Sequence, residues 1–285
     1  MRHAQLRAFH NVAIHGGFSR AAEALSLTQP ALSDQVRKLE AEYDIRLFDR
    51  SRKQIEITQA GSRLLEITRR LFEIEDLARD MLSESRSLRS GTLRIVSDTP
   101  YHIVELLAAF RARYPGVQVS VRSGNSAEVS AALASYEADI GVLGEIPSGS
   151  EYDVIDLSQA PLIAFVSAGS PLSDAGDISL GDLARSPLVL RETGSRTRSK
   201  LEEAFAAARL KPSSYVEAEG REAVREIVAA GGGVGIVSEA EFGTDTRLVA
   251  LPIRDANLLM DEALVCLRER RDSRMIRAFM GLAAG

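Results

Sequence analysis

The sequence has little of what an extracellular or membrane protein needs. It contains one cysteine, Cys266, among 285 residues, so no internal disulfide can form and a reducing compartment fits. This cysteine stands in the apolar stretch ALVCL, where we expect it to be a small buried hydrophobic residue. No run of 18 apolar residues occurs, and the N-terminal stretch lacks the apolar core of a signal peptide. These absences predict a cytoplasmic protein without a membrane partner.

Motifs of the common enzyme classes are missing as well. There is no G-x-S-x-G elbow and no P-loop. The glycine run 231–235 lies between a predicted helix and a following strand, whereas the dinucleotide fingerprint needs strand, glycines and helix in that order. No metal-ligand spacing with cysteine or carboxylates is found for the histidines His3, His10, His15 and His102. We therefore predict no metal and no cofactor, and an enzyme acting on amino acids or nucleotides is the weaker alternative.

The most informative segment is Gly17–Arg50, whose pattern is typical of two short helices joined by a tight turn. Ser19 is suited to cap the first helix. Thr28 is suited to cap the second, and Pro30 falls in its first turn, where a missing N–H does no harm. An amphipathic helix should precede the pair, with Leu6, Phe9, Val12 and Ala13 as its buried stripe.

The second helix of this pair has two distinct faces. Its inward face is predicted from steps of four and three at Leu32, Val36 and Leu39. A polar stripe recurs at steps of four at Gln29, Ser33 and Arg37. This spacing suits a recognition helix in the major groove of double-stranded DNA, with its N-terminal residues at base edges and its basic end at phosphates. The predicted DNA contacts are Ser19, Thr28, Gln29, Pro30, Ser33, Asp34, Gln35, Arg37, Lys38, Arg50, Arg52 and Lys53.

The net charge of −5 is unevenly divided along the chain. Residues 1–58 hold nine basic and seven acidic residues, which gives +2 and leaves −7 for the remainder. This asymmetry is typical of a basic reading head on an acidic body. The basic residues at 50–53 fall between two strand-like stretches, RLF and IEI. We interpret them as the tip of a two-stranded wing that grips phosphate; an ordinary solvated hairpin turn is the alternative.

Over about the first 65 residues the sequence resembles the LysR-type transcriptional regulators. The matching stretches are FSRAAEALSLTQPALSDQVRKLEAEYDIRLFDR and ITQAGSRLL, against the family pattern FTxAAexLxxsQpalSxqIxxLEexLGxxLFxR and xxTxAG. Two positions depart from it. Asp34 stands where the family usually has a basic or neutral polar residue, so it either sharpens base choice or points sideways. Tyr43-Asp44 replaces the usual Leu-Gly at a helix end, which should affect the turn rather than the reading of DNA.

A long helix is predicted after this head, because no proline occurs between Thr58 and Pro100. Thirty helical residues would extend about 45 Å. Steps of three and four define an apolar seam at Leu64, Ile67, Leu71, Ile74, Ala78 and Met81, continued by Ser85 and Leu88. A second copy of the chain is the simplest cover for this seam, and the alternative is a helix buried within one globular domain. Leu65 and Phe72 form a second stripe that could pack on the head.

A dimer would also suit DNA recognition, since two symmetric heads can engage the two half-sites of an inverted repeat. The family resemblance implies the same linker and, in many members, tetramers built from two dimers. We further expect RNA polymerase as a partner.

Short apolar strands alternate with helices in the remaining chain, which predicts parallel-containing sheets covered by helices. Among the predicted strands are Thr92–Ser97, Pro161–Ser167 and Glu262–Leu267. The resemblance extends here, more loosely, through GTLRIV, FRARYPGVQV, ADIGV, PLV-RETGSRTR and AAGGGVGIVS. It implies a two-lobed effector-binding region that looks like a periplasmic binding protein.

The predicted fold class is therefore α+β and α/β in one chain. It comprises a winged helix-turn-helix at 1–58, a linker helix at 59–90 and an effector domain at 91–285. Lobe 1 would hold 91–161 plus 265–285, and lobe 2 would hold 162–264, with two crossing strands as a hinge. A ligand in the cleft could change lobe closure and, through it, the spacing of the heads.

Polar side chains gather in loops that precede predicted helices. Hydroxyl and N–H groups at helix N-termini favour carboxylate or phosphate groups, and the arginines of TGSRTR add guanidinium groups suited to oxyanions. The predicted effector contacts are Ser97, Asp98, Thr99, Asn125, Ser126, Glu145, Thr193, Ser195, Arg196 and Arg198. The family resemblance supports Ser97, Thr99, Ser126, Thr193 and Ser195. Ordinary helix caps are the alternative. Asp98 and Glu145 favour an effector that also carries an amine.

These observations predict a ligand-responsive transcription regulator. A binding module without a role in gene regulation is a further alternative, and the reading head argues against it.

Overall fold

The computed structural model describes residues 1–49, 55–82, 91–147 and 149–284, apart from the side chains of Asp80 and Met81. The chain forms two compact units, Met1–Ser85 and Arg86–Gly285. The predicted domain and lobe boundaries stay predictions. Among the described residues, no helix is both long and apolar enough to cross a bilayer.

The first unit is a small helical domain with a two-stranded hairpin. Its elements are α1 (His3–His15), α2 (Phe18–Ala24), α3 (Gln29–Tyr43), β1 (Phe48–Asp49), β2 (Glu56–Ile57) and α4 (Gln59–Leu82). β1 and β2 pair antiparallel, as predicted for the wing. The core gathers the predicted apolar stripes: Leu6, Phe9, Val12, Leu32, Val36 and Leu39 are all buried. One predicted cap is wrong: α2 begins at Phe18 with Gly17 as its N-cap, so Ser19 lies inside the first turn.

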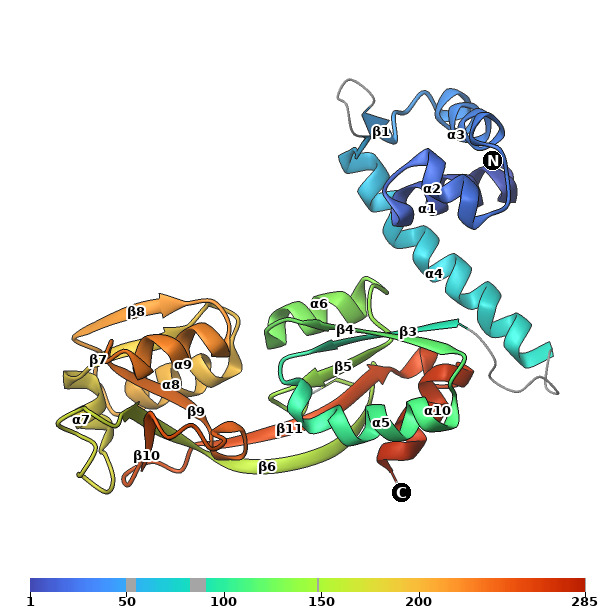
Figure 1. Cartoon of the computed structure of the whole chain (residues 1–285). Coiled ribbons are helices and arrows are strands. Elements are labelled where there is room, and N and C mark those ends of the chain that lie inside the picture. Colours follow the sequence, from blue (N-terminus) through green and yellow to red (C-terminus); the bar gives the residue numbers. More distant parts are fainter. Residues whose placement is uncertain (50–54, 83–90, 148, 285) are drawn as a thin grey trace. The chain divides into compact units, whose positions relative to one another are not determined.

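The start of α4 is fastened to the strand that enters the wing. The Thr58 hydroxyl donates to the Arg46 carbonyl at 2.8 Å and accepts from the Gly61 N–H at 3.0 Å. A Cβ at position 61 would lie 2.3 Å from the Leu47 carbonyl oxygen, so only glycine fits there. The helix then extends past α1 and α2 (Figure 1), and Leu64, Leu65 and Phe72 pack against the head. The predicted helical residues 83–90 lie outside the described part of the chain.

The second unit contains one continuous mixed sheet in the order β4-β3-β5-β11-β6-β9-β7-β8, with β10 paired to β6. In its first half lie β3 (Gly91–Ser97), η1 (Pro100–Ile103), α5 (Val104–Arg113), β4 (Val117–Ser123), α6 (Ser126–Ala134), β5 (Ile140–Leu143), η3 (Arg268–Arg270) and α10 (Arg274–Ala283). The second half contains α7 (Leu180–Arg185), β7 (Pro187–Arg191), α8 (Arg196–Ala207), β8 (Ser214–Ala218), α9 (Arg221–Ala229), β9 (Val234–Ser238), η2 (Glu239–Glu241) and β10 (Leu248–Pro252). The strands β6 (Tyr152–Ser167) and β11 (Leu259–Leu267) run through both halves.

Each half, hereafter lobe 1 and lobe 2, covers its sheet on both faces. In lobe 1, α5 and α10 lie on one face and α6 on the other (Figure 1). In lobe 2, α7 and α8 cover one face and α9 the other. β3 pairs parallel with β4 and β5, and β7 pairs parallel with β8 and β9, so the predicted parallel-containing sheets are confirmed. Cys266 is fully buried in lobe 1, and burial raises the pKa of its thiol to about 12.

The crossing strands are longer than the sequence pattern suggested. The strand predicted at Pro161–Ser167 begins at Tyr152, and the one predicted at Glu262–Leu267 begins at Leu259. β6 and β11 pair antiparallel with each other over residues 152–161 and 259–267, with a bulge between Glu262 and Ala263. Many of these residues are polar and only partly buried, which hides the apolar run that marks a central strand.

Candidate functional site

The exposed face of α3 has the polar stripe that its sequence predicted. Gln29 and Arg37 are exposed, and Ser33 is half-buried between them. The Thr28 hydroxyl caps the helix by accepting from the Ala31 N–H at 3.4 Å, and Pro30 lies in the first turn. Within its unit, α3 therefore presents hydrogen-bonding side chains to solvent along one side.

The acidic residue nearest the polar stripe of this helix, Asp34, is partly neutralised. Asp34 and Lys38 are both exposed and form an ion pair at 2.7 Å, one helical turn apart. Gln35 is half-buried and Ser19 is exposed on α2. The predicted phosphate contacts Arg50, Arg52 and Lys53 lie outside the described residues.

A half-buried anchor that the sequence analysis missed holds the wing. One oxygen of the Glu40 carboxylate accepts from the backbone N–H groups of Leu47 and Phe48, at 2.9 and 3.2 Å. Glu40 thereby ties the end of α3 to β1. No motif marks this role, because it depends on where the chain turns after the helix.

The apolar seam of α4 is uncovered within its unit. Ile67 and Ile74 are each 63% exposed, Leu71 is 40% exposed, and Ala78 is exposed. Leu64 differs, because it also packs on the head. The prediction that Leu65 and Phe72 pack there is confirmed.

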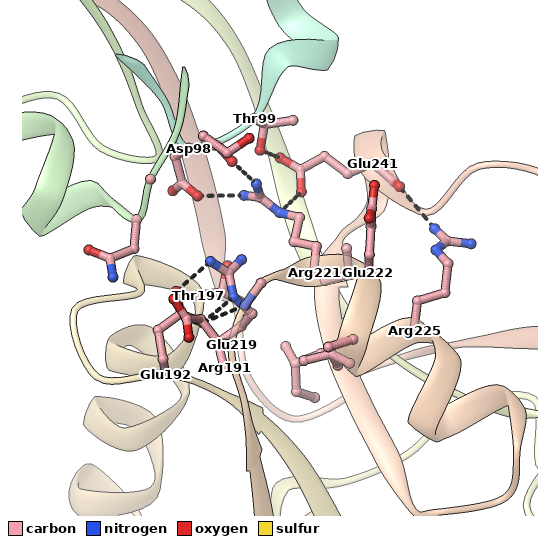
Figure 2. A pocket seen from close by; sticks show the side chains of 18 of the residues that line it. Asp98, Thr99, Arg191, Glu192, Thr197, Glu219, Arg221, Glu222, Arg225 and Glu241 are labelled. Carbon is pink, nitrogen blue, oxygen red and sulfur yellow. Dashed lines mark hydrogen bonds and ion pairs between the residues drawn. The ribbon is translucent and has the colours of Figure 1, made fainter. Parts of the chain in front are cut away.

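A cavity of about 660 Å³ in the second unit is lined by both lobes. Lobe 1 contributes Asp98, Thr99 and Asn125, and lobe 2 contributes Arg191 and Arg221. Arg221 extends between the two lobes (Figure 2), with Nη2 at 3.1 Å from the Asp98 carboxylate and Nε at 2.7 Å from Glu241. The Thr99 hydroxyl donates to Glu241 at 2.7 Å. Charged and hydroxyl groups thus bridge the lobes at the wall of the cavity.

Only part of the predicted effector set lines this cavity. Asp98, Thr99 and Asn125 do. Ser126 is buried behind Asp98 and donates to its carboxylate at 2.9 Å. Ser97 and Ser195 are buried, and their hydroxyls have no hydrogen-bond partner among the residues described.

The remaining predicted residues lie outside the lining. Arg196 pairs with Glu145 and Glu203, each at 2.8 Å, so the Arg196–Glu145 pair joins the lobes instead of facing the cavity. Arg198 pairs with Glu202 at 2.8 Å and with Glu217 on β8 at 2.5 Å. Thr193 is exposed. Acidic neighbours engage these guanidinium groups, and the predicted effector contacts of Arg196 and Arg198 stay predictions.

Arg191 is the most informative group that the sequence analysis missed. It lies at the carboxyl end of β7, where ligands of parallel sheets are usually bound, so the strand pattern could have indicated it. Its Nε and Nη2 bond Glu192 at 2.8 and 2.7 Å, but the buried Nη1 has no hydrogen-bond partner in the described chain. Burial disfavours the charge on Glu192, yet hydrogen bonds from Arg191 and the Gly220 N–H outweigh it and lower the pKa of Glu192 to about 2.

A second cluster that the sequence analysis missed adjoins the cavity. His102, Glu241 and Glu262 bring potential ligand atoms within 4.8 Å of one another. Their positions in the sequence are far apart, so no spacing rule could find them. Burial, together with the Glu241 and Asp98 carboxylates, raises the pKa of Glu262 to about 9. Against the effect of burial, His102 and Arg221 lower the pKa of Glu241.

Comparison with known proteins matches both units. Residues 3–62 match the family described as bacterial regulatory helix-turn-helix protein, lysR family, and residues 86–285 match the LysR substrate binding domain. The chain is 33% identical over 236 residues to the HTH-type transcriptional activator CmpR of Synechocystis sp., which covers 82% of this chain and 78% of that protein.

Two solved structures share the fold. One is full-length CbnR complexed with its target DNA, with a TM-score of 0.67, 20% identity, and coverage of 100% of this chain and 99% of that one. The other is the regulatory domain of CcmR from Synechocystis PCC6803 in complex with 2-PG, with a TM-score of 0.62, 23% identity, and coverage of 69% and 97%. The predicted winged helix-turn-helix, two-lobed body and non-enzymatic role agree with these matches. The chain belongs to the family of LysR-type transcriptional regulators.

Proposed function

We propose that this regulator binds two DNA half-sites as a dimer and responds to a small ligand held between its lobes. The observation that carries the DNA-binding part is the solvent-facing stripe of Gln29, Ser33 and Arg37 on α3. Side chains at this spacing reach base edges and phosphates when a helix lies in the major groove. CbnR, a protein of the same fold, is described in complex with target DNA.

Dimerisation is supported by the uncovered seam on α4. Exposed isoleucine and leucine side chains in a continuous row are costly in water, at about 25 cal/mol per Å² of apolar surface. A second α4 would bury this row in knobs-into-holes packing. The division into a head at 1–58, a linker at 59–90 and two lobes from 91 onward is part of this proposal, as are tetramers, contact with RNA polymerase and a cytoplasmic location.

The ligand is proposed to have an anionic group and a hydrogen-donating or cationic group. The unpartnered Nη1 of Arg191 is a buried donor at the cavity wall, which suits a carboxylate or phosphate oxygen. However, Asp98, Glu192 and Glu241 also line the cavity, and acidic side chains outnumber the three arginines there. These three carboxylates pair with Arg191 or Arg221, but the surplus of acidic side chains in the lining would repel a simple anion. A zwitterion can pair with both the arginines and the carboxylates. The 2-PG in the CcmR structure is a plain anion, so it serves as the ligand for comparison.

Ligand-induced stabilisation tests this proposal. The melting temperature of the full chain would be measured with 2-phosphoglycolate and with phosphoserine, which adds an amine. We expect phosphoserine to stabilise the chain more than 2-phosphoglycolate does. At a concentration a hundredfold above its dissociation constant, phosphoserine should raise the free energy of unfolding by about 2.7 kcal/mol. Arg191→Gln should abolish the effect, while Arg198→Gln, outside the lining, should keep it. Equal or greater stabilisation by 2-phosphoglycolate would remove the amine from the proposal, and no stabilisation by either compound would contradict the choice of ligand class.

A further inference from the structure

Three ionisable side chains converge beside the inter-lobe cavity, and of these only Glu241 figures in the function proposed above. His102 Nε2 lies 3.6 Å from Glu241 Oε1 and 3.8 Å from Glu262 Oε1. The three side chains are 7%, 4% and 2% exposed. Such a concentration of buried donors and acceptors needs a compensating partner.

The groups at the centre of the cluster have none among the residues that the structure describes. His102 Nε2 and both oxygens of Glu262 are buried without a hydrogen-bond partner. Leaving a buried polar group unpaired costs about 1–3 kcal/mol. Three such atoms facing one another therefore point to a shared species between them.

The surrounding groups hold two of these side chains in position. His102 Nδ1 faces the Ser158 hydroxyl at 3.4 Å, and histidines that ligate metals commonly have their second nitrogen held in this way. Glu241 accepts from the Thr99 hydroxyl on one oxygen and pairs with Arg221 on the other, both at 2.7 Å. The first oxygen, Oε1, is also the one nearest to His102 Nε2, and its second lone pair could bind a ligand.

We propose that His102, Glu241 and Glu262 bind a divalent transition-metal ion that joins the two lobes. Bonds of about 2.0 Å to a tetrahedral ion separate its ligands by about 3.3 Å, so the two distances from His102 Nε2 need only a small contraction. One imidazole and two carboxylates suit Zn²⁺ or Mn²⁺, and a dication balances both carboxylate charges. A water molecule can complete the coordination.

The ligands come from different parts of the second unit. His102 lies on η1 of lobe 1, Glu241 on η2 of lobe 2, and Glu262 on the crossing strand β11. An ion bound to all three would restrain one lobe against the other. Metal availability would then influence the same movement that a cavity ligand influences, whatever the identity of that ligand.

Metal content and melting temperature of the full chain test the site. Chain stripped with a chelator would be dialysed against Zn²⁺ or Mn²⁺ separately. We expect one ion per chain and a higher melting temperature with at least one of the two. Loss of an outer-shell partner alone weakens metal sites about 10–100-fold, so Glu262→Gln and His102→Gln should each weaken binding at least about a hundredfold. Glu239→Gln removes an exposed carboxylate on the same η2 turn and should leave the affinity unchanged within about twofold.

The variants should fold, because glutamine has the size and shape of the Glu262 side chain and can form hydrogen bonds in its place. Should Glu262→Gln fail to fold, His102→Gln decides alone. Absence of a bound ion, or the same affinity in all variants, would overturn the metal site. DNA binding by the stripped chain, measured in parallel, separates that failure from a failure of the proposed regulator.

Discussion

At the scale of single residues, Asp44 shows how a departure from the family pattern is accommodated. It ends α3 in the left-handed conformation, with φ 50° and ψ 45°, at the position where the family usually has glycine. Aspartate tolerates this region better than most side chains, but at some cost. The expectation that this position affects the turn rather than the DNA-facing stripe follows from the sequence and agrees with the geometry.

Substitution at Asp44 should reveal that cost. Asp44→Gly should stabilise the first unit by about 0.5–1 kcal/mol, because glycine adopts positive φ freely. Asp44→Ala should destabilise it by about 1 kcal/mol, since alanine pays the full steric penalty without a compensating polar group. Urea denaturation measures both, and the same sign for the two variants would contradict the explanation.

Asp139 has a structural role that the sequence analysis did not predict. The residue appeared there only as part of the matching stretch ADIGV. It is buried, accepts from the Arg94 N–H at 2.6 Å, and pairs with Arg94 and Arg270. Burial alone would raise the pKa of its carboxyl, but the hydrogen bond and charge of Arg94, with the charge of Arg270, lower it. The carboxylate is therefore ionised in the folded protein at a pH where it would begin to protonate in the unfolded chain.

Removal of this charge should destabilise the second unit in a pH-dependent way. Asp139→Asn should cost about 3 kcal/mol at pH 7, because it removes the negative charge beside the buried guanidinium group of Arg270. A lowered pKa gives stability that is complete above the ordinary value of 3.8 and is lost as the pH falls through the folded value. The difference between the two proteins should be constant from pH 7 to about 5 and shrink below 3.8. The control Asp177→Asn breaks an exposed pair with Arg254 and should cost less than about 1 kcal/mol; an equal cost for both would contradict the role of burial.

At the scale of elements, the sequence predicted most where periodicity is strong. The buried faces of α1 and α3 followed from their steps of three and four. The lengths of the crossing strands β6 and β11 were underestimated. Their central position in the sheet comes from pairing with neighbouring strands and not from an apolar sequence of their own. The Ser19 cap failed because glycine at position 17 already starts the helix.

The seam of α4 gives the test at this scale. Leu71→Asp places a charge in the middle of the exposed apolar row and should shift the chain from dimer to monomer in sedimentation at micromolar concentration. Arg79→Asp on the same helix, away from the seam positions, is the matched control and should leave the dimer intact. A sedimentation profile unchanged by Leu71→Asp would show that the seam is not the interface.

At the scale of the whole molecule, the sequence predicted the succession of parts better than the site. The DNA-binding head could be predicted from local motifs, because α2, its turn and α3 are contiguous in the sequence. The inter-lobe groups are not contiguous: Asp98, Arg191, Arg221 and Glu241 meet only after two lobes have folded around crossing strands. Acidic and basic side chains then neutralise one another in ways that composition cannot show, as Arg196 and Arg198 illustrate.

The central claim is that the polar side of α3 reads duplex DNA, and selection from a random duplex library tests it without knowledge of the target genes. The full chain should enrich an inverted repeat with half-sites about one helical turn apart or a multiple of that distance. Arg37→Ala should relax the base preference at defined positions of each half-site. If Arg37 contacts a base, the binding free energy should weaken by about 1–3 kcal/mol. Enrichment of no motif, or an unchanged motif and affinity with both Arg37→Ala and Ser33→Ala, would contradict the account.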